Sequence, residues 1–377
     1  MQLYSQIFDR VIDFSGCIFP GIDGLFNVEL VCGDFNKNLT ETKTEIEFQH
    51  TSLWNENLRT VAGARIRLDE FDSETYNDGY TKNLNKSLFT NVEYRLNEFW
   101  LMNAGGMYEA DNLNGEYFSP RLALNYQPTS LDTIRFIYSE AIRSPDLFEQ
   151  NGQLVFTIRN AISQIDQSEK PNQIIKFGEE ESDLDFEKIK SRELSYFGLY
   201  PSINAQLDIK IFYDELTGLI SEGLGHNIEL TNSNKLDQKG IETQYKVQLT
   251  EQDNIALTLS YIEVDDDFEG NTSFISQENS LSADRSGSLS WIHKFSKNTV
   301  LGSAYYHVEN WNTSADDLFY TFSRLDMNIR HTLNLSQDYA LTLQGAVQYR
   351  FDDDPLGRDR NFYSDDHFVY GSAQLKF

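Results

Sequence analysis

The last segment of the chain, residues 366–377, alternates strictly between two kinds of side chain. The apolar set is Val369, Gly371, Ala373, Leu375 and Phe377, and the polar set is Ser372, Gln374 and Lys376. A period of two residues indicates a β-strand with one apolar face. A strand of this kind that ends the chain on an aromatic residue is typical of outer-membrane β-barrels. We therefore interpret Val369, Leu375 and Phe377 as a barrel-assembly signal.

The same alternation recurs in the interior of the chain. Four clear examples are residues 203–213, 241–249, 324–335 and 339–350. Helical spacing fits none of them, so they predict strands. No apolar run is long enough for a membrane helix. A barrel needs no such run, because only every second residue of a strand faces lipid.

Short and long connections take turns between the predicted strands. The tight turns lie near Gln337, Ser296, Glu251, Pro201, Pro128, Asn97 and Glu56, and the long polar links lie near 352–365, 311–319, 266–283, 215–236, 144–189, 71–84 and 15–41. Unequal loops on two sides are typical of a transmembrane barrel, with short periplasmic turns and longer extracellular loops. We predict an all-β chain: a transmembrane, antiparallel, up-and-down barrel wall of about 16 strands.

Aromatic residues make up 13% of the chain, including 26 Phe and 20 Tyr, which favours strands over helices. Trp100, Trp291 and Trp311 lie near predicted strand ends, and Tyr339 and Tyr349 lie at the two ends of one strand. Aromatic rings at such positions are typical of the girdles that mark the two membrane interfaces.

The charge balance is strongly acidic, with 31 basic and 59 acidic residues and a net charge of −28. Nucleic acid is excluded as a partner, because phosphate binding needs a basic surface. Short acidic runs occur at 179–181, 265–267 and 352–354. They fit solvated loops, or loops whose carboxylates bridge divalent cations to anionic lipopolysaccharide or bind a cationic ligand.

Cys17 and Cys32 flank one predicted loop. In an oxidising periplasm they can form a disulfide, whereas a cytosolic chain would keep two free thiols. Residues 1–10 have no basic segment followed by an apolar one, so they are not a signal peptide. We expect that the true amino-terminus of an outer-membrane protein lies upstream of this chain.

No catalytic or metal site is indicated. The six histidines, His50, His226, His293, His307, His331 and His367, form no closely spaced pair, and no cysteine is near them. The chain lacks a glycine-rich phosphate loop and a G-x-S-x-G elbow. We predict that it is not an enzyme and has no cofactor.

Charged residues on the polar faces of the strands are candidates to line the barrel lumen. They are Lys210, Glu242, Arg324, Asp326, Arg330 and Arg350. Charged side chains at membrane depth are tolerated where they face water or protein. These residues either hydrate the lumen and pair with one another, or face a plug or a translocation path.

Several segments resemble the β-barrel of TonB-dependent outer-membrane receptors. They are residues 119–126 (SPRLALNY), 135–149 (RFIYSEAIRSPDLFE), 193–196 (ELSY), 237–242 (DQKGIE) and 370–377 (YGSAQLKF). They occur in the family's order from about residue 42 to the end of the chain. Three features differ from the family pattern. About 16 strands are present rather than 22, no plug domain is found, and Leu375 stands third from the end where an aromatic residue is common.

The resemblance implies that residues 1–377 are a partial receptor barrel, with 144–189 as a large extracellular loop. It also implies uptake of a scarce nutrient, namely siderophore-bound iron, haem, cobalamin or a glycan. Its partners would be outer-membrane lipid and lipopolysaccharide, the barrel-assembly machinery and, through a plug, the inner-membrane TonB complex. A concave site among long loops suits ligand binding. The candidate ligand-binding residues are Arg143, Phe148, His226, Trp311, Tyr320 and Arg358.

Two other functions fit the same sequence. A passive 16-stranded porin needs no plug and would show steady conductance without ligand. A soluble β-rich binding or adhesion protein would be recovered from cells without detergent.

Overall fold

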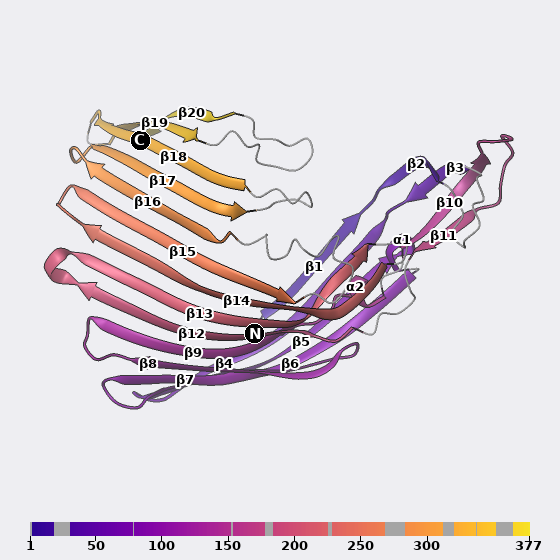
Figure 1. Ribbon diagram of the computed structural model, residues 1–377, viewed down its shortest axis with the longest axis horizontal. Helices are drawn as coiled ribbons and strands as arrows, with labels where there is room; N and C mark the ends of the chain where they lie inside the picture. The colour runs from indigo at the N-terminus through magenta and orange to yellow at the C-terminus, as the bar shows by residue number, and fades with distance from the viewer. Residues whose placement is uncertain are drawn as a thin grey trace.

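The computed structural model describes residues 2–18, 31–77, 79–151, 154–177, 184–224, 228–267, 283–311, 320–336, 338–351 and 365–377. Most of these residues belong to one large antiparallel sheet, which curves strongly (Figure 1). No helix in the described ranges is long and apolar enough to cross a membrane.

Sixteen strands form this sheet in the described part of the chain. In sheet order they are β1 (Gln2–Arg10), β4 (Leu39–Asn55), β5 (Leu58–Ser73), β6 (Gly79–Arg95), β7 (Trp100–Asp111), β8 (Gly115–Tyr126), β9 (Asp132–Arg143), β12 (Glu187–Tyr200), β13 (Ala205–Leu224), β14 (Ile228–Gln248), β15 (Asp253–Asp267), β16 (Arg285–Lys294), β17 (Thr299–Trp311), β18 (Tyr320–Asn334), β19 (Ala340–Arg350) and β20 (His367–Lys376). The predicted all-β class, antiparallel pairing and strand number are confirmed.

The pairing register gives the sheet two faces of opposite character. Leu194, Ile211 and Ile241 are cross-strand neighbours on β12, β13 and β14, and they are 51%, 53% and 41% exposed. The adjacent row on the other face pairs Lys210 with Glu242. Because side chains alternate along a strand, each strand contributes to both faces. We call these the apolar face and the polar face.

At one end of the strands, tight turns are closed by the side chain of their first polar residue. The oxygen of this side chain accepts hydrogen bonds from the backbone N–H groups two and three residues later. The residues that do so are Asn97, Thr129, Thr250, Ser296 and Ser336. Short polar side chains favour such turns because they substitute for a backbone acceptor. We call this end the turn rim and the opposite end the loop rim.

Two predicted connections at the loop rim were wrong, and one tight turn there was not predicted. Residues 215–236 largely extend strands β13 and β14, which continue beyond their neighbours. Between β5 and β6, the predicted link 71–84 is only the short helix α1 (Glu74–Asn77) with the residue after it. A tight hairpin joins β7 to β8, and Asp111 Oδ1 accepts hydrogen bonds from the backbone N–H groups of residues 113 and 114. Gly115 follows at φ +88°, a conformation that glycine adopts without steric cost.

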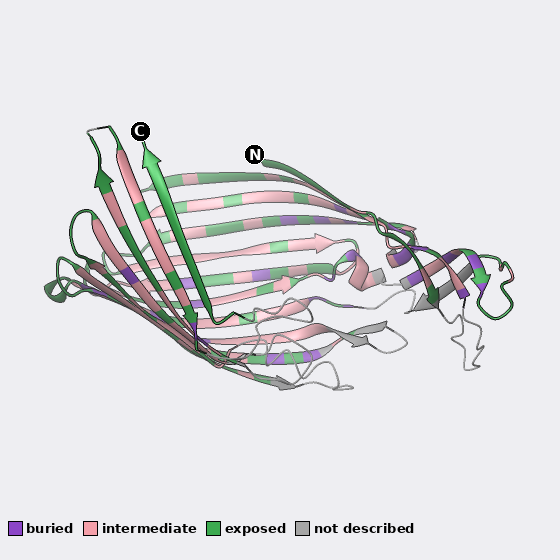
Figure 2. Cartoon of the chain, turned by 90° about the horizontal axis from the view of Figure 1, so that it is seen from above, coloured by how far each residue is buried: buried purple, intermediate pink, exposed green. Residues whose placement is uncertain are grey.

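The large sheet is open among the described residues, because its two edge strands, β1 and β20, are not paired with each other. These strands carry the two ends of the chain (Figure 2). The sheet therefore matches the predicted barrel wall, without detected closure.

A second, four-stranded sheet projects beyond the loop rim (Figure 1). Its order is β11 (Gln173–Phe177), β10 (Leu154–Ser163), β3 (Val31–Asn36) and β2 (Asp13–Ile18). The segment 144–189 thus contains β10, β11 and the helix α2 (Leu147–Asn151). We call the four strands the outer sheet.

Candidate functional site

The outer sheet joins two segments that are far apart in sequence. Strand β10 pairs with β3, so that Arg159 lies opposite Asp34 and Ile162 lies opposite Cys32. A small core holds the strands together. It contains Val31, Phe35, Ile158 and Ala161, which are at most 6% exposed, with Phe156 packed against them. Burial of these side chains supplies the hydrophobic stabilisation that the isolated hairpins would lack.

A disulfide between Cys17 and Cys32 links β2 to β3, with an S–S distance of 1.99 Å. Both cysteines are directly opposite each other in the register of these strands. The bond therefore fixes the outer edge of the sheet to its core strand.

Polar contacts also connect the strands of the outer sheet. The Asp34 carboxylate accepts hydrogen bonds from Asn160 Nδ2 and Ser15 Oγ, both at 2.8 Å. These two donors, the Asn160 amide first, lower the pKa of Asp34 because they stabilise its charged form. In the connection between β10 and β11, hydrogen bonds from Ser168 lower the pKa of Asp166 to about 2. The carboxylates of Asp34 and Asp166 are therefore ionised when they accept these hydrogen bonds.

Helix α1 connects the outer sheet to the large sheet. Arg159 of β10 donates to Glu74 of α1, with 2.6 Å between Nη2 and Oε1. This hydrogen bond is the main reason that the pKa of Glu74 is lowered. Tyr76 of α1 makes an edge-to-face contact with Phe148 of α2, with ring centroids 5.9 Å apart. Two helices and the outer sheet thus form one continuous assembly above the wall.

A cavity of about 240 Å³ lies where α2 meets the polar face of β4, β5 and β6. Its lining includes Glu41, Lys43, Arg67, Asp69, Phe71, Asn83 and residues 144–148. Lys43 pairs with Glu41 at 3.2 Å and Arg67 with Asp69 at 2.9 Å. The cavity therefore presents charges of both signs beside the apolar side chains of Phe71 and Phe148.

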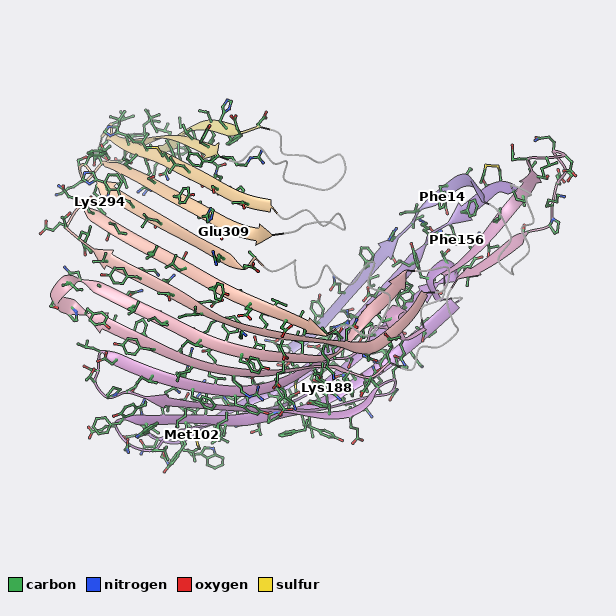
Figure 3. All side chains as sticks on the ribbon, viewed as in Figure 1. Phe14, Met102, Phe156, Lys188, Lys294 and Glu309 are labelled. Carbon is green, nitrogen blue, oxygen red and sulfur yellow. A yellow bond between two sulfur atoms is a disulfide. The ribbon has the colours of Figure 1, made fainter. Side chains whose placement is uncertain are left out.

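Lys37 is a functional candidate that the sequence did not single out. Its Nζ lies 5.4 Å from the ring centroid of Phe14 and 6.0 Å from that of Phe156. Both phenylalanines lie on the outer sheet (Figure 3). Phe14 stacks on Phe35 at 5.2 Å and remains 39% exposed. A cation over aromatic rings is a recurrent recognition element. Only the pairing of β3 with β2 on one side and with β10 on the other brings these residues together, so no local pattern could have indicated them.

The predicted ligand residue Arg143 is engaged by the protein itself. Its Nη1 and Nη2 donate to the two carboxylate oxygens of Glu149 at 2.8 and 3.0 Å, and its Nε donates to Glu187. Phe148 lines the cavity described above. Arg143 therefore joins the ends of β9 and β12 to α2, and of the two residues only Phe148 lies on a cavity wall.

Of the other four predicted ligand residues, two fall on paired strand ends and two on residues that the structure does not describe. His226 and Arg358 lie outside the described residues. Trp311 and Tyr320 are cross-strand neighbours at the ends of β17 and β18, and their side chains also lie outside the described part.

The six residues predicted to line the lumen all lie on strands of the large sheet. Lys210 and Glu242 form an ion pair at 2.5 Å. Arg324 Nη2 donates to Asp326 Oδ2 at 3.0 Å, and the pairing register places both on the same face as Arg350. Arg350 is only 7% exposed, and its Nε and Nη1 have no hydrogen-bond partner among the described residues. Arg330 lies four residues after Asp326 on β18, so the two side chains are on the same face. Four of the six charges therefore pair with one another on the polar face, as Lys210 with Glu242 and Arg324 with Asp326.

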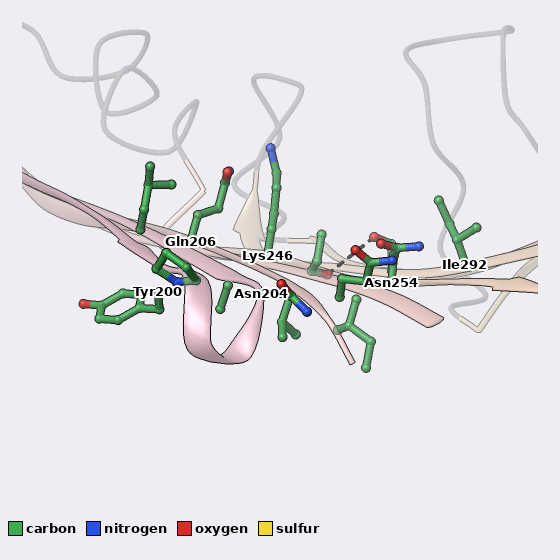
Figure 4. A pocket seen from close by; sticks show the side chains of 14 residues that line it. Tyr200, Asn204, Gln206, Lys246, Asn254 and Ile292 are labelled. Carbon is green, nitrogen blue, oxygen red and sulfur yellow. Dashed lines mark hydrogen bonds between the residues drawn. The ribbon is translucent and has the colours of Figure 1, made fainter. Parts of the chain in front are cut away.

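Two hollows lie on the polar face of the large sheet. One, of about 600 Å³, is lined by Lys210, Glu242, Arg135 and Tyr306 with neighbouring polar residues of β12 to β17. The other, of about 500 Å³, lies near the turn rim, where Gln206 and Lys246 project from one side of the sheet (Figure 4). No group of three or more His, Cys, Asp or Glu side chains among the described residues could hold a metal ion.

The terminal strand β20 ends the large sheet as an edge strand. Val369, Leu375 and Phe377 are 67%, 52% and 89% exposed. Val369 and Leu375 are opposite Val347 and Leu341 of β19, so they extend the apolar face to the last strand.

Comparisons with known proteins agree with this architecture. The family model described as TonB dependent receptor-like, beta-barrel, matches residues 14–349. No curated protein sequence matches the chain. Among solved structures, a mutant of the ferric enterobactin receptor PfeA from Pseudomonas aeruginosa superposes with a TM-score of 0.68 at 14% identity, over 99% of this chain and 59% of that one.

Two further structures are similar. The siderophore receptor PirA from Acinetobacter baumannii has a TM-score of 0.67 at 11% identity, over 100% of this chain and 59% of that one. The FrpB iron transporter from Neisseria meningitidis has a TM-score of 0.61 at 10% identity, over 84% and 55% respectively. The chain therefore spans little more than half the length of these proteins, and identities this low indicate a shared fold alone.

Proposed function

The chain belongs to the TonB-dependent receptor β-barrel family of the outer membrane, and on this premise we propose that it is the barrel wall of a receptor for a ferric siderophore. The family is one of receptors, not enzymes. The observation that carries the proposal is the family match over residues 14–349, combined with the assembly of loops at one rim of the wall.

The loop rim is the extracellular side in this proposal, and the turn rim is the periplasmic side. Support comes from the unequal connections, because bacterial outer-membrane barrels have short periplasmic turns and longer extracellular loops. The apolar face then meets lipid, and the polar face lines the lumen with residues such as Lys210 and Arg324. The disulfide between Cys17 and Cys32 fits an oxidising compartment.

Ligand capture takes place at the assembly formed by the outer sheet, α1 and α2. Lys37 with its aromatic neighbours, and the cavity beside Phe148, offer cationic and aromatic contacts. Such contacts suit an anionic, aryl-bearing iron chelate. A ferric siderophore is preferred over haem, cobalamin or a glycan because the similar structures are named for ferric enterobactin, siderophores and iron.

Transport beyond capture requires energy from the inner membrane. In the proposed receptor this comes from the TonB complex through a plug domain, as the family resemblance implies. The barrel-assembly machinery inserts the wall, and lipid and lipopolysaccharide surround it. The charged polar face provides the water-filled surface that the ligand passes.

Uptake of radioactive iron tests this function. The intact gene should restore uptake of a ferric siderophore to a strain that lacks its own siderophore receptors, and restoration should require TonB. A matched variant without residues 154–177 should reach the outer membrane at normal levels but lose siderophore binding. Steady conductance without ligand in a planar bilayer, with no TonB-dependent uptake, would instead establish a porin. If uptake of only haem, cobalamin or a glycan is restored, that compound and not a ferric siderophore is the ligand.

A further inference from the structure

Strands β8 and β9 are neighbours in the large sheet, but they are paired along only part of their length. Residues 121–126 of β8 pair with residues 134–139 of β9. Toward the loop rim, residues 115–120 of β8 pair with β7 alone, and residues 140–143 of β9 pair with β12 alone. The wall is therefore split at this rim between two strands that follow each other in sequence. We call the split the seam.

Pro120 explains where the pairing ends. It is the first residue of β8 beyond the part that pairs with β9. Proline has no backbone N–H to donate to a neighbouring strand, so it is found at strand edges and interruptions. Beside it, Ser119 is 8% exposed, and its Oγ has no hydrogen-bond partner among the described residues. A buried hydroxyl without a partner is uncommon, and here it indicates incomplete packing of polar groups beside the seam.

Side chains, and not the backbone, close the seam. Tyr117 Oη of β8 donates to Glu140 Oε2 of β9 at 3.0 Å, and Ser144 Oγ donates to Asp111 Oδ2 at 2.9 Å. Lys188 (Figure 3) lies over the Tyr117 ring, with its Nζ 5.6 Å from the ring centroid. A few side-chain contacts hold two strands less firmly than a continuous ladder of backbone hydrogen bonds. The seam is therefore a line of weakness in the wall.

The outer sheet spans this seam. The β8 side of the wall consists of β1 and β4 to β8, and it carries β2, β3 and α1. The β9 side consists of β9 and β12 to β20, and it carries β10, β11 and α2. Pairing of β3 with β10 beyond the loop rim joins the two sides in one ladder (Figure 1). The outer sheet thus runs from one side of the seam to the other.

Contacts between the two sides are firm within the outer sheet and its helices. Its core joins two residues of β3 to two of β10, namely Val31, Phe35, Ile158 and Ala161. Arg159 of β10 donates to Glu74 of α1, and Tyr76 of α1 makes an edge-to-face contact with Phe148 of α2. Each of these contacts has one partner on each side of the seam. Burial of the core is the larger stabilising term, because exposed ion pairs contribute little.

The cavity beside α2 also lies between the two sides. Its wall residues from β4, β5 and β6, such as Asp69 and Phe71, belong to the β8 side. Residues 144–148, which complete its lining, belong to the β9 side. Any change in the width of the seam therefore changes the opening of this cavity.

We propose that the outer sheet is a strap that holds the seam shut, and that loosening of the strap lets the wall part at the loop rim and opens the cavity beside α2. The turn-rim portions of β8 and β9 stay paired, so the movement is a hinge about residues 121 and 139. Only the role of the cavity in ligand capture rests on the proposed function. The movement itself requires no ligand.

Distances across the seam test this proposal, measured by double electron–electron resonance on the intact protein in detergent. Spin labels at Glu116→Cys and Ala141→Cys report the seam, because both residues are exposed and lie on opposite sides of it. Labels at Leu122→Cys and Phe136→Cys are the matched control, because these exposed residues lie in the paired part of the same two strands. The native disulfide takes no label.

Two variants loosen the strap, Ile158→Ala in its core and Arg159→Glu in its ion pair. In each variant we expect the seam distance to lengthen by about 5 Å, one strand spacing, and its distribution to broaden. The control distance should stay unchanged. Addition of Glu74→Arg to Arg159→Glu should restore the native seam distance, because the ion pair is then formed with its charges exchanged.

A seam distance that stays native in both variants would overturn the proposal, and hydrogen exchange in β3 and β10 verifies separately that the strap is loosened. Equal lengthening at the control positions would also overturn it, because the wall would then loosen as a whole. Failure of the native protein to take up iron would refute the proposed transport function and leave these distances unaffected. The two proposals can therefore fail independently.

Discussion

Arg159 of β10 and Glu74 of α1 form an ion pair, with 2.6 Å between Nη2 and Oε1, although 85 residues separate them in sequence. Through this contact the outer sheet is attached to the helix that joins β5 to β6. The pair is about 42% and 41% exposed, so its own contribution to stability is modest. Its importance is positional, because it orients the assembly that we propose captures the ligand.

Reversal of one charge in this pair should loosen the outer sheet without unfolding the wall. Arg159→Glu places two carboxylates together, and an exposed pair of this kind is worth at most about 1 kcal/mol. Limited proteolysis should then cut residues 144–189 faster while the thermal melting of the wall stays unchanged. The double variant Arg159→Glu with Glu74→Arg should restore resistance. If the double variant remains as sensitive as the single one, the ion pair does not hold the sheet.

Acid should release the same contact. The hydrogen bond from Arg159 lowers the pKa of Glu74, so the ionised form is favoured in the folded state. The stabilisation is therefore complete above the unfolded pKa of roughly 4.3 and is lost as pH falls through the lower folded value. Anisotropy of a dye attached at Ile165→Cys, followed from pH 7 to pH 3, should report this release. The pKa of Asp34 is also lowered, so protonation of Asp34 contributes to the same change in anisotropy. The variant Asp34→Asn removes this contribution, and the additional substitution Glu74→Gln should remove the remaining change.

Ile158 should be essential for the outer sheet, because it is fully buried in its core. Ile158→Ala leaves a cavity, and such a truncation usually costs 2–5 kcal/mol. Hydrogen exchange in β3 and β10 should rise strongly, while exchange in β12 to β15 stays slow. Ile165→Ala is the matched control, because Ile165 is 70% exposed. Comparable exchange in the two variants would show that the four buried residues do not form a separate core.

Loss of the disulfide should act on the same sheet. Cys17 and Cys32 are 15 residues apart, and a cross-link of this length restricts the unfolded segment by about 3 kcal/mol. The variant Cys17→Ser with Cys32→Ser should therefore show faster exchange over residues 13–36. Its level in the outer membrane should be normal, because neither cysteine belongs to the large sheet. A fall in that level would mean that the disulfide is needed for assembly of the wall.

Deletion of Phe377 should impair assembly in the outer membrane while secretion across the inner membrane remains normal. The residue is 89% exposed at the end of edge strand β20, so its removal costs the folded chain little packing. Quantification of the protein in outer-membrane and periplasmic fractions measures the effect. Phe368→Ala, on the polar face of the same strand, is the control. A normal outer-membrane level for the deletion would show that Phe377 carries no assembly signal.

Local sequence predicted much of the wall because its determinants are local. The alternation around Ile209 and Ile241 indicated which side chains share the apolar face, and the register confirms it. Asn97 and Thr250 were near predicted tight turns, and their side chains close those turns by hydrogen bonds within three residues. The extended ends of β13 and β14 were missed, because shifts in the pairing register between Thr217 and Ser221 interrupt the two-residue alternation there.

The surroundings of the candidate ligand residues depend on contacts that the sequence does not indicate. Arg143 was chosen for its charge in a loop, but its guanidinium group is held by Glu149 and Glu187. No pattern within either segment indicated that Lys37 would meet Phe14 and Phe156. The groups that meet at a rim depend on which loops pack together, and the spacing of residues along one strand does not predict this packing.

By itself, the sequence determined a sheet with one lipid-compatible face, its strand number, its tight turns and its outer-membrane family. The apolar face, the strands and the tight turns follow from residues within a few positions of one another, and the family follows from the order of several such segments along the chain. Only the tertiary structure decided that residues 13–36 and 154–177 form one sheet, and that α1 attaches it to the wall through Glu74 and Arg159. The physical reason is that these features arise from burial and charge pairing between distant segments, and such contacts have no periodic signal along the chain.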